Sequence, residues 1–347
     1  MFNPESLLRP HLKSLVPYSS ARDDYQGTEG VFLDANENPL GSITEENWNR
    51  YPDPYQRALK ARIGEIKEVS PDRIYLGNGS DEPIDLLFRA FCEPGQDEVI
   101  INPPTYGMYK VSADINNVAL KEVLLTKDYD LDVEGIKAQI TDNTKMIFLC
   151  SPNNPTGNDL GLDKIKEVLK AFNGLVVIDE AYVDFTDRES YIHQLDEYPN
   201  LLVLQTFSKA WGLAALRLGM AFASPELIAI LNKIKPPYNL SGLTQQTVLK
   251  ALDNVEQKDE MVAQILENRT QLETDLNSLD QVQEVYPSDA NFFLVRLAGA
   301  RSVYERLIEK QIILRDRSRV VLCEDGLRIT VGTAAENKKL IEALEEL

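Results

Sequence analysis

Four short apolar runs stand out in the first two thirds of the chain. They read EVIIN, MIFLC, LVVID and LLVLQ and cover residues 98–102, 146–150, 175–179 and 201–205. Runs that are apolar at nearly every position are typical of parallel strands buried on both faces. Between them lie amphipathic stretches such as residues 162–172, where Ile165, Leu169 and Phe172 recur at helical spacing. This alternation predicts an α/β domain with a mostly parallel central sheet flanked by helices.

The pattern changes in the last third of the chain. Residues 242–278 form a long, charged and amphipathic stretch that predicts helix. Beyond it, the β-rich segments VQEVYP, NFFLVRL, IILRD and LRITVG are mixed with helical patterns over residues 301–310 and 335–346. This texture predicts a smaller α+β domain, against which we expect an N-terminal arm to pack. The predicted domains are a large one over residues 31–245 and a smaller one formed by residues 1–30 and 246–347.

Charge and composition argue against several classes of function. The formal net charge is −19, and such an acidic surface repels nucleic acids and anionic membranes. Two histidines and three well-separated cysteines argue against a His-based triad, a metal site or a disulfide framework. No apolar run reaches membrane-spanning length, and the N-terminus lacks the apolar core of a signal peptide. We therefore expect a cytoplasmic protein with neither a nucleic-acid nor a membrane partner.

Chemically useful side chains follow the ends of the predicted strands, where open α/β sheets bind their ligands. Asp179 ends the run LVVID, and a carboxylate there is costly unless it is paired or hydrogen-bonded. Lys209 follows LLVLQ in a small, apolar segment whose next charge is Arg217. A desolvated lysine loses its proton readily and can act as an amine nucleophile. The candidate site residues are Ser80, Tyr106, Asn154, Asp179, Tyr182, Lys209 and Arg217.

Each candidate also has a purely structural interpretation. The glycine turn before Ser80 resembles any tight strand–helix connection, although such a turn can also cradle a phosphate. Tyr106 could pack on the next helix, and Asn154 could simply form a turn. Asp179 could cap a helix, and Lys209 could extend to the surface. The convergence of all these residue types on one sheet edge favours a ligand site.

Several motifs resemble those of fold-type I, pyridoxal-phosphate-dependent aminotransferases over essentially the whole chain. SPNNPTG (151–157), DEAY (179–182), TFSKAWGLAALRLG (206–219) and LRITVG (327–332) occur in that family's order and spacing. A narrower resemblance, to histidinol-phosphate aminotransferases of the class II subfamily, is carried by four further motifs. These are LDANENPLG (33–41), RYPDPY (50–55), GNGSDE (77–82) and IILRDRS (312–318).

The resemblance implies pyridoxal 5'-phosphate as the cofactor, bound covalently by Lys209. It implies that Asp179 pairs with the pyridine nitrogen and keeps it protonated, which makes the ring an electron sink. Tyr106 would stack on the ring, and Lys209, Asp179 and Tyr182 would be the catalytic residues. The implied cofactor-binding residues are Ser80, Asp81, Tyr106, Asn154, Asp179, Tyr182, Thr206, Ser208, Lys209, Arg217 and, from the partner subunit of a homodimer, Tyr51.

The resemblance also implies a substrate site and a reaction. Arg328 would clamp the substrate α-carboxylate with its planar fork of donors. Arg315 and Tyr18 would hold the substrate phosphate, and Asn36 would line the site. The implied reaction is transamination between L-histidinol phosphate and 2-oxoglutarate, which gives imidazole acetol phosphate and L-glutamate, a step of histidine biosynthesis.

Two other interpretations remain open at this point. Another fold-type I enzyme, such as an aromatic amino acid aminotransferase or a threonine-phosphate decarboxylase, would share Lys209 and Asp179 and differ in how the distal group is held. A non-enzymatic regulator with an aminotransferase-like body would need a DNA-binding module. The predicted domains leave no residues for such a module, and the net charge opposes it.

Overall fold

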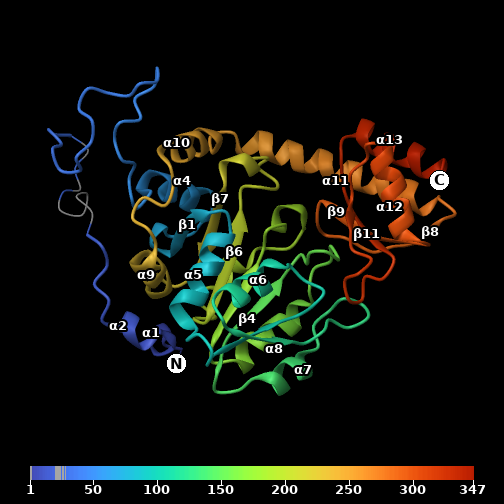
Figure 1. Cartoon of the computed structure of the whole chain (residues 1–347), viewed down its shortest axis with the longest axis horizontal. Coiled ribbons are helices and arrows are strands. Elements are labelled where there is room, and N and C mark those ends of the chain that lie inside the picture. The colour runs from blue at the N-terminus through green and yellow to red at the C-terminus, as the bar shows by residue number, and fades with distance from the viewer. Residues whose placement is uncertain (1, 20–24, 26, 28) are drawn as a thin grey trace.

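The computed structural model describes residues 2–19, 25, 27 and 29–347, and within them a seven-stranded sheet forms the centre of the larger unit (Figure 1). Its strand order is β1-β7-β6-β5-β4-β2-β3, and among these strands only β7 runs against the others. The four apolar runs form β2, β4, β5 and β6, which confirms the predicted parallel sheet. The strands are β1 (Ile74–Asn78), β2 (Glu98–Ile101), β3 (Ala119–Glu122), β4 (Thr144–Cys150), β5 (Leu175–Asp179), β6 (Leu201–Thr206) and β7 (Leu218–Phe222).

Helices cover both faces of this sheet, which is why the strands β2, β4, β5 and β6 are apolar at nearly every position. Val176 and Ile178 of β5 pack into one core cluster, while Leu175 and Val177 pack into the other. The first face carries α4 (Arg57–Lys67), α7 (Val133–Gln139), α8 (Leu162–Ala171) and α10 (Gly242–Ala251). The second carries α5 (Asp81–Phe91), α6 (Met108–Ile115) and α9 (Pro225–Ile234).

The smaller unit is an antiparallel sheet with helices on it, as the sequence predicts. Its strand order is β10-β11-β9-β8, and its core joins the sheet to α11, α12 and α13. The predicted helix over 242–278 is two helices, α10 and α11, and α11 spans the distance between the two units (Figure 1). The elements are α11 (Val255–Asn277), β8 (Val282–Val285), β9 (Phe292–Leu297), α12 (Ala300–Glu309), β10 (Arg315–Asp316), β11 (Gly326–Thr330) and α13 (Ala334–Glu345).

The N-terminal helices pack against the large unit, not the small one. Leu8, between α1 (Pro4–Leu7) and α2 (Pro10–Lys13), is buried in the cluster under α5 and α9. The backbone N–H of Arg9 donates to the carbonyl of Ala90, at the end of α5. The expectation that residues 1–30 join the smaller domain is therefore wrong for residues 2–13, because their apolar side chains find partners on α5 and α9. Residues 1, 20–24, 26 and 28 lie outside the described part, and the domain bounds stay a prediction.

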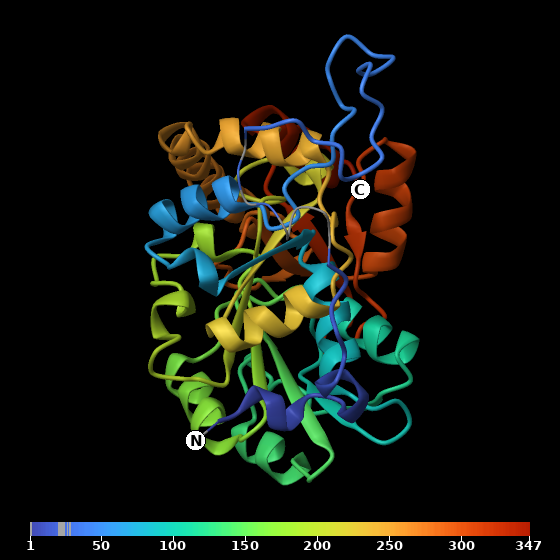
Figure 2. The same cartoon turned by 90° about the vertical axis from the view of Figure 1, so that its left-hand side faces the viewer.

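Within the chain between α2 and α4, residues 29–45 stand away from the body in both views (Figures 1 and 2). Leu33 and Leu40 are 87% and 93% exposed, and Val31 and Ile43 are exposed as well. Four 3-10 helices complete the described secondary structure: η1 (Pro71–Arg73), η2 (Val183–Phe185), η3 (Tyr191–Gln194) and η4 (Ala214–Leu216). Among the described residues, none of the helices combines the length and apolarity that crossing a membrane requires.

Candidate active site

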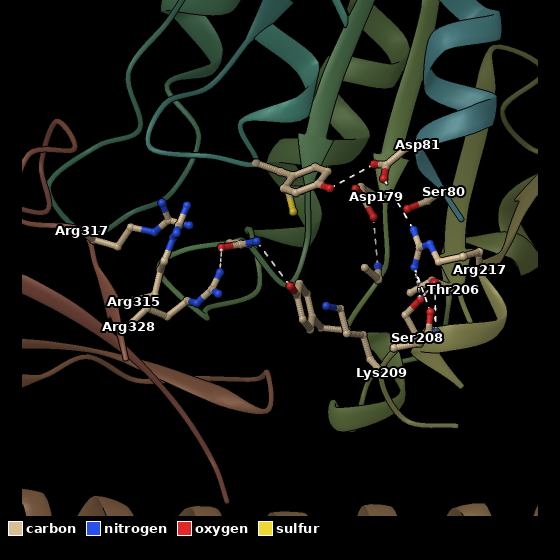
Figure 3. A pocket seen from close by; sticks show the side chains of 16 residues that line it. Ser80, Asp81, Asp179, Thr206, Ser208, Lys209, Arg217, Arg315, Arg317 and Arg328 are labelled. Carbon is tan, nitrogen blue, oxygen red and sulfur yellow. Dashed lines mark hydrogen bonds and ion pairs between the residues drawn. The ribbon is translucent and has the colours of Figure 1, made fainter. Parts of the chain in front are cut away.

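A cavity of about 470 Å³ opens at the carboxyl ends of the parallel strands, with the smaller unit forming its opposite wall (Figure 3). We call it the Lys209 cavity. Most of the residues expected from the sequence line it, although their individual roles stay predictions. The lining residues are Ser80, Asp81, Tyr106, Cys150, Asn154, Asp179, Ala181, Tyr182, Thr206, Ser208, Lys209, Ala214, Arg217, Arg315, Arg317 and Arg328.

The sheet topology explains why residues so far apart in sequence meet here. Strands β2, β4, β5 and β6 are parallel, so the segments that follow them emerge at one edge. These segments bring Tyr106, Asn154 and Lys209 to the cavity, and Asp179 ends β5 there. Strand β7 runs the other way, so the residue that precedes it, Arg217, reaches the same edge.

Asp179 is a buried carboxylate without a cationic partner. Asp179 is only 2% exposed. Its Oδ2 atom accepts a hydrogen bond from the hydroxyl of Tyr109 at 2.8 Å, and its Oδ1 atom accepts one from the N–H of Ala181 at 3.1 Å. Within the described residues it forms no ion pair with a basic side chain. Burial raises the pKa of Asp179 to about 6, against the opposing effect of these hydrogen bonds. A protonated ring nitrogen placed here would supply the absent positive charge.

Lys209 presents its amine to the cavity. Its Nζ atom lies 5.4 Å from the centre of the Tyr182 ring, and it forms no hydrogen bond or ion pair with any residue that the structure describes. Enclosure by the cavity walls lowers the pKa of Lys209, and the positive charge of Arg328 lowers it further, while Asp179 acts in the opposite direction. An amine that loses its proton more readily is a better nucleophile and a better proton carrier at neutral pH.

Anion-binding groups from three elements converge beside Lys209 (Figure 3). Ser80 precedes α5 and lines the cavity, and its side chain makes no capping hydrogen bond to the first N–H groups of this helix. Thr206 and Ser208 share a hydroxyl–hydroxyl contact of 3.0 Å. One guanidinium nitrogen of Arg217 lies 3.5 Å from the Ser208 hydroxyl, and another lies 3.9 Å from Asp81. Together these donors suit a phosphate group.

Two glycines allow Arg217 and β7 to approach the N-terminus of α5 closely, and we call the resulting group of donors the phosphate cradle. A Cβ atom on Gly219 would lie 2.3 Å from the backbone nitrogen of Ser80, so any side chain there would push β7 away from the turn before α5. Gly79 adopts a left-handed φ of +68°, and a Cβ on it would lie 2.6 Å from a guanidinium nitrogen of Arg217. The close approach of Arg217 to the helix N-terminus therefore depends on both glycines.

The far wall of the cavity is built by arginines of the smaller unit. Arg328, on β11, donates to Oδ1 of Asn154 at 2.7 Å, and its guanidinium lies 5.2 Å from the centre of the Phe292 ring. Asn154 also lies within 3.4 Å of the Tyr182 hydroxyl. Within the described residues, neither Arg315 nor Arg328 forms an ion pair with a carboxylate. The wall thus offers free guanidinium groups to an anion.

Two of the residues that build the site escaped the sequence analysis. Tyr109 donates to Asp179 but lies on the buried face of α6, between two aromatic rings. Arg317 lines the cavity two residues after Arg315. Arg317 lies inside the motif IILRDRS, and Tyr109 lies three residues after Tyr106. The signal that could have identified Arg317 is the alternation of Arg315 and Arg317 around Asp316, because alternate residues of an extended chain share a face.

Three expected site residues lie elsewhere in the single chain. Tyr18, Asn36 and Tyr51 line a second cavity of about 590 Å³, not the Lys209 cavity. The ring of Tyr51 stacks on that of Tyr238, with centroids 4.5 Å apart. All three are exposed. Within one chain they do not meet Lys209, so their expected roles stay predictions.

Comparison with known proteins identifies the family. The family model for aminotransferases of class I and II matches residues 25–344. The histidinol-phosphate aminotransferase of Cytophaga hutchinsonii is 58% identical over 344 residues, which cover 99% of each chain. A crystal structure of the histidinol-phosphate aminotransferase of Sinorhizobium meliloti with pyridoxal-5'-phosphate superposes with a TM-score of 0.79, at 24% identity and over 97% of this chain and 96% of that one.

A decarboxylase also shares the fold. The L-threonine-O-3-phosphate decarboxylase of Porphyromonas gingivalis superposes with a TM-score of 0.73, at 26% identity, over 86% of this chain and 90% of that one. Enzymes that are named for different reactions thus share this fold. The family model, however, spans both units and contains every residue of the Lys209 cavity. The chain therefore belongs to the class I and II aminotransferase family.

Proposed function

We propose that this protein is a histidinol-phosphate aminotransferase, which transfers the amino group of L-histidinol phosphate to 2-oxoglutarate with pyridoxal 5'-phosphate as cofactor. The products are imidazole acetol phosphate and L-glutamate. Full-length relatives at 48–58% identity carry this name, and the features that support a phosphorylated substrate lie in the Lys209 cavity. A cytoplasmic location stays a prediction from the sequence.

The observation that carries the proposal is the presence of two separate anion sites on either side of Lys209. One is the cradle of Ser80, Thr206, Ser208 and Arg217, which would hold the cofactor phosphate. The other is the arginine wall of the smaller unit, which would hold the anionic groups of the substrate (Figure 3). In a protein with a net charge of −19, Arg315 and Arg328 form no ion pair with a carboxylate among the described residues, which favours anionic substrates.

The residues present fit pyridoxal phosphate. Asp179 supplies a buried carboxylate for the ring nitrogen, and Tyr106 offers a half-buried aromatic face. The cofactor, when bound, supplies the electron sink that makes the carbon next to the substrate amine acidic. The protein's share of the chemistry is then to bind, to orient and to move protons.

We infer that different side chains perform these tasks. Asp179 would hold a positive charge at the ring nitrogen, kept in place by the Tyr109 hydroxyl. Lys209 would hold the cofactor and then, as a free amine of lowered pKa, carry a proton at its Nζ atom. Arg328, oriented by Asn154, would bind the carboxylate of glutamate or 2-oxoglutarate with two parallel hydrogen bonds.

A homodimer would complete this site. The described part of the chain between α2 and α4 exposes aliphatic side chains, among them Leu33 and Leu40. Tyr18, Asn36 and Tyr51 belong to the same part of the chain and line the second cavity. We propose that a second copy of the chain covers this surface, and that Tyr51 thereby reaches the phosphate cradle of the partner while Tyr18 and Asn36 approach its substrate site.

A half-reaction tests the proposed function directly. The holoenzyme is mixed in separate experiments with L-histidinol phosphate, L-phenylalanine or threonine phosphate, and conversion of the cofactor to its amine form is followed by absorbance. We expect fast conversion with L-histidinol phosphate and reversal by 2-oxoglutarate. Faster conversion with L-phenylalanine would favour an aromatic aminotransferase, and release of CO₂ from threonine phosphate without amine transfer would favour a decarboxylase.

A further inference from the structure

Three arginines of the smaller unit point into the Lys209 cavity, and one of them, Arg317, has no role in the function described so far (Figure 3). Arg315 belongs to β10 and Arg317 follows two residues later, so both project to the same side of an extended segment. Asp316 projects to the opposite side, where its carboxylate binds Arg301 at 2.9 Å and accepts a hydrogen bond from Ser318. The intervening acid is thus kept away from both arginines.

Among the described residues, Arg317 has no carboxylate partner. Its Nε–H is buried without a hydrogen-bond acceptor, and Arg317 forms no ion pair in the part of the chain that the structure describes. Arg188, by contrast, is held by Glu180 at 2.7 Å and Asp159 at 3.0 Å. Burial lowers the pKa of Arg317, and the charges of Arg328 and Arg315 lower it further. The guanidinium of Arg317 therefore lacks a hydrogen-bond acceptor and a counter-charge among the described residues, and an anion that enters the cavity would supply both.

The three arginines, Arg315, Arg317 and Arg328, form a cluster of like charges that an anion would stabilise. Arg315 and Arg328 are direct register partners on β10 and β11, and like charges placed opposite each other destabilise a sheet. Arg328 lies towards Lys209, since its charge lowers the pKa of that lysine. Arg315 and Arg317 lie farther from Lys209 in Figure 3. The cluster thus has a proximal member and a distal pair.

We propose that Arg317 is a specificity-determining residue that, together with Arg315, binds the distal anionic group of the substrate and favours a phosphate ester over a carboxylate. The inference rests on the proposed function and adds a residue to its substrate site. A phosphate ester carries close to two negative charges and three acceptor oxygens at neutral pH, so it can engage two guanidinium groups at once. A single carboxylate is already satisfied by one arginine fork, so the second arginine adds less to its binding.

Replacing the charge at this one position provides the test. Arg317→Gln is compared with the matched control Arg319→Gln, which removes an exposed arginine two residues along that does not line the cavity. We expect Arg317→Gln to lower kcat/KM for L-histidinol phosphate about 10- to 100-fold, and kcat/KM for L-glutamate by less than about 3-fold. Arg317→Lys, which keeps the charge and loses the fork, should fall between wild type and Arg317→Gln. Equal losses for both substrates would overturn the proposal.

Calorimetry with inorganic phosphate gives a second readout that is independent of turnover. The holoenzyme is used, because the bound cofactor already fills the other phosphate cradle. Phosphate should bind wild type and Arg319→Gln alike, and about 10-fold more weakly to Arg317→Gln. Unchanged affinity in Arg317→Gln would overturn the proposal. If wild type fails to convert L-histidinol phosphate, the proposed function is wrong, and the calorimetric comparison then decides by itself whether Arg317 binds phosphate.

Discussion

The carboxylate of Asp179 is buried with two neutral hydrogen-bond donors and, among the described residues, no cationic side chain bonded to it. Its pKa of about 6 lies above the ordinary value of 3.8. Between these two values the folded chain holds more protons than the unfolded chain does. The free energy of unfolding of the cofactor-free protein therefore receives a contribution from Asp179 that decreases as the pH rises from about 4 to about 6.

Asp179→Asn should remove this pH dependence. We expect the unfolding free energy of the cofactor-free variant, measured relative to cofactor-free wild type, to rise by about 2–3 kcal/mol between pH 4 and pH 7. Urea unfolding at several pH values measures it. Asp142→Asn, at an exposed aspartate outside the site, is the control and should follow wild type. If the profiles of Asp179→Asn and wild type run parallel, the burial of an uncompensated charge at this position is refuted.

Lys209→Ala should abolish covalent attachment of the cofactor and lower turnover by about 10³-fold or more, because the variant loses both the amine nucleophile and the proton carrier. The visible absorbance of the bound cofactor and the mass of the protein after borohydride reduction measure attachment. Lys127→Ala, at an exposed lysine outside the cavity, should retain both. A reduced adduct that persists in Lys209→Ala would assign the attachment to another lysine.

The residues that the sequence predicted well are those whose type conflicts with their neighbours. Asp179 and Lys209 are charged side chains that follow buried apolar strands, where a charge is costly unless it is paired, hydrogen-bonded or extended to the surface. Tyr109 escaped because a tyrosine on an apolar helix face looks like core, and its bond to Asp179 appears only in three dimensions. Arg317 escaped because one arginine in IILRDRS already satisfied the expected phosphate contact.

At the scale of elements, β7 is what closes the phosphate cradle, and Gly219 is the residue that lets it do so. Gly219→Ala would place a Cβ 2.3 Å from backbone atoms of Gly79 and Ser80, so β7 and the turn before α5 must separate. We expect a loss of about 1–3 kcal/mol in unfolding free energy and weaker binding of pyridoxal phosphate. Gly107→Ala, where an added Cβ meets nothing within 4 Å, should change stability by less than about 0.5 kcal/mol. Equal behaviour of the two variants would mean that β7 tolerates displacement.

The four buried apolar runs were predicted as strands, whereas the fully buried β7 and the exposed or half-buried β3 were not. The four buried runs became strands because helices cover both of their faces. IILRD yields only the two-residue β10, and β3 escaped because it is an edge strand whose residues are exposed or half-buried. The reversed direction of β7 could not be deduced, since the apolar run LGMAF is compatible with either direction.

In the assembled protein, we expect a second copy of the chain to cover the exposed aliphatic side chains of Val31, Leu33, Leu40 and Ile43. A mixture of two defective variants tests the proposed sharing of Tyr51. Lys209→Ala and Tyr51→Phe are unfolded together and refolded in equal amounts. If Tyr51 serves the partner's site, each hybrid dimer contains one site with both native residues, and the mixture should recover about a quarter of wild-type activity.

Refolding each variant alone provides the control for this mixture. Without sharing, the mixture can reach only the mean activity of the two variants refolded alone, and that result would place Tyr51 in its own subunit's site or outside both.

The packing of the N-terminal arm could not be predicted from the sequence. Its short helices carry too few apolar residues to indicate which unit they pack against. In the structure, Leu8 packs against α5 and α9 of the large unit.

The arginine wall lies within a strongly acidic protein, so an approaching anion meets two opposing fields. At about 0.15 M ionic strength the screening length is about 8 Å, so the mouth of the cavity attracts while the rest of the surface repels. Added salt first relieves the distant repulsion and then weakens the local attraction. The rate at which a doubly charged substrate is captured should therefore pass through a maximum as salt is raised, which would give this enzyme a preferred ionic strength.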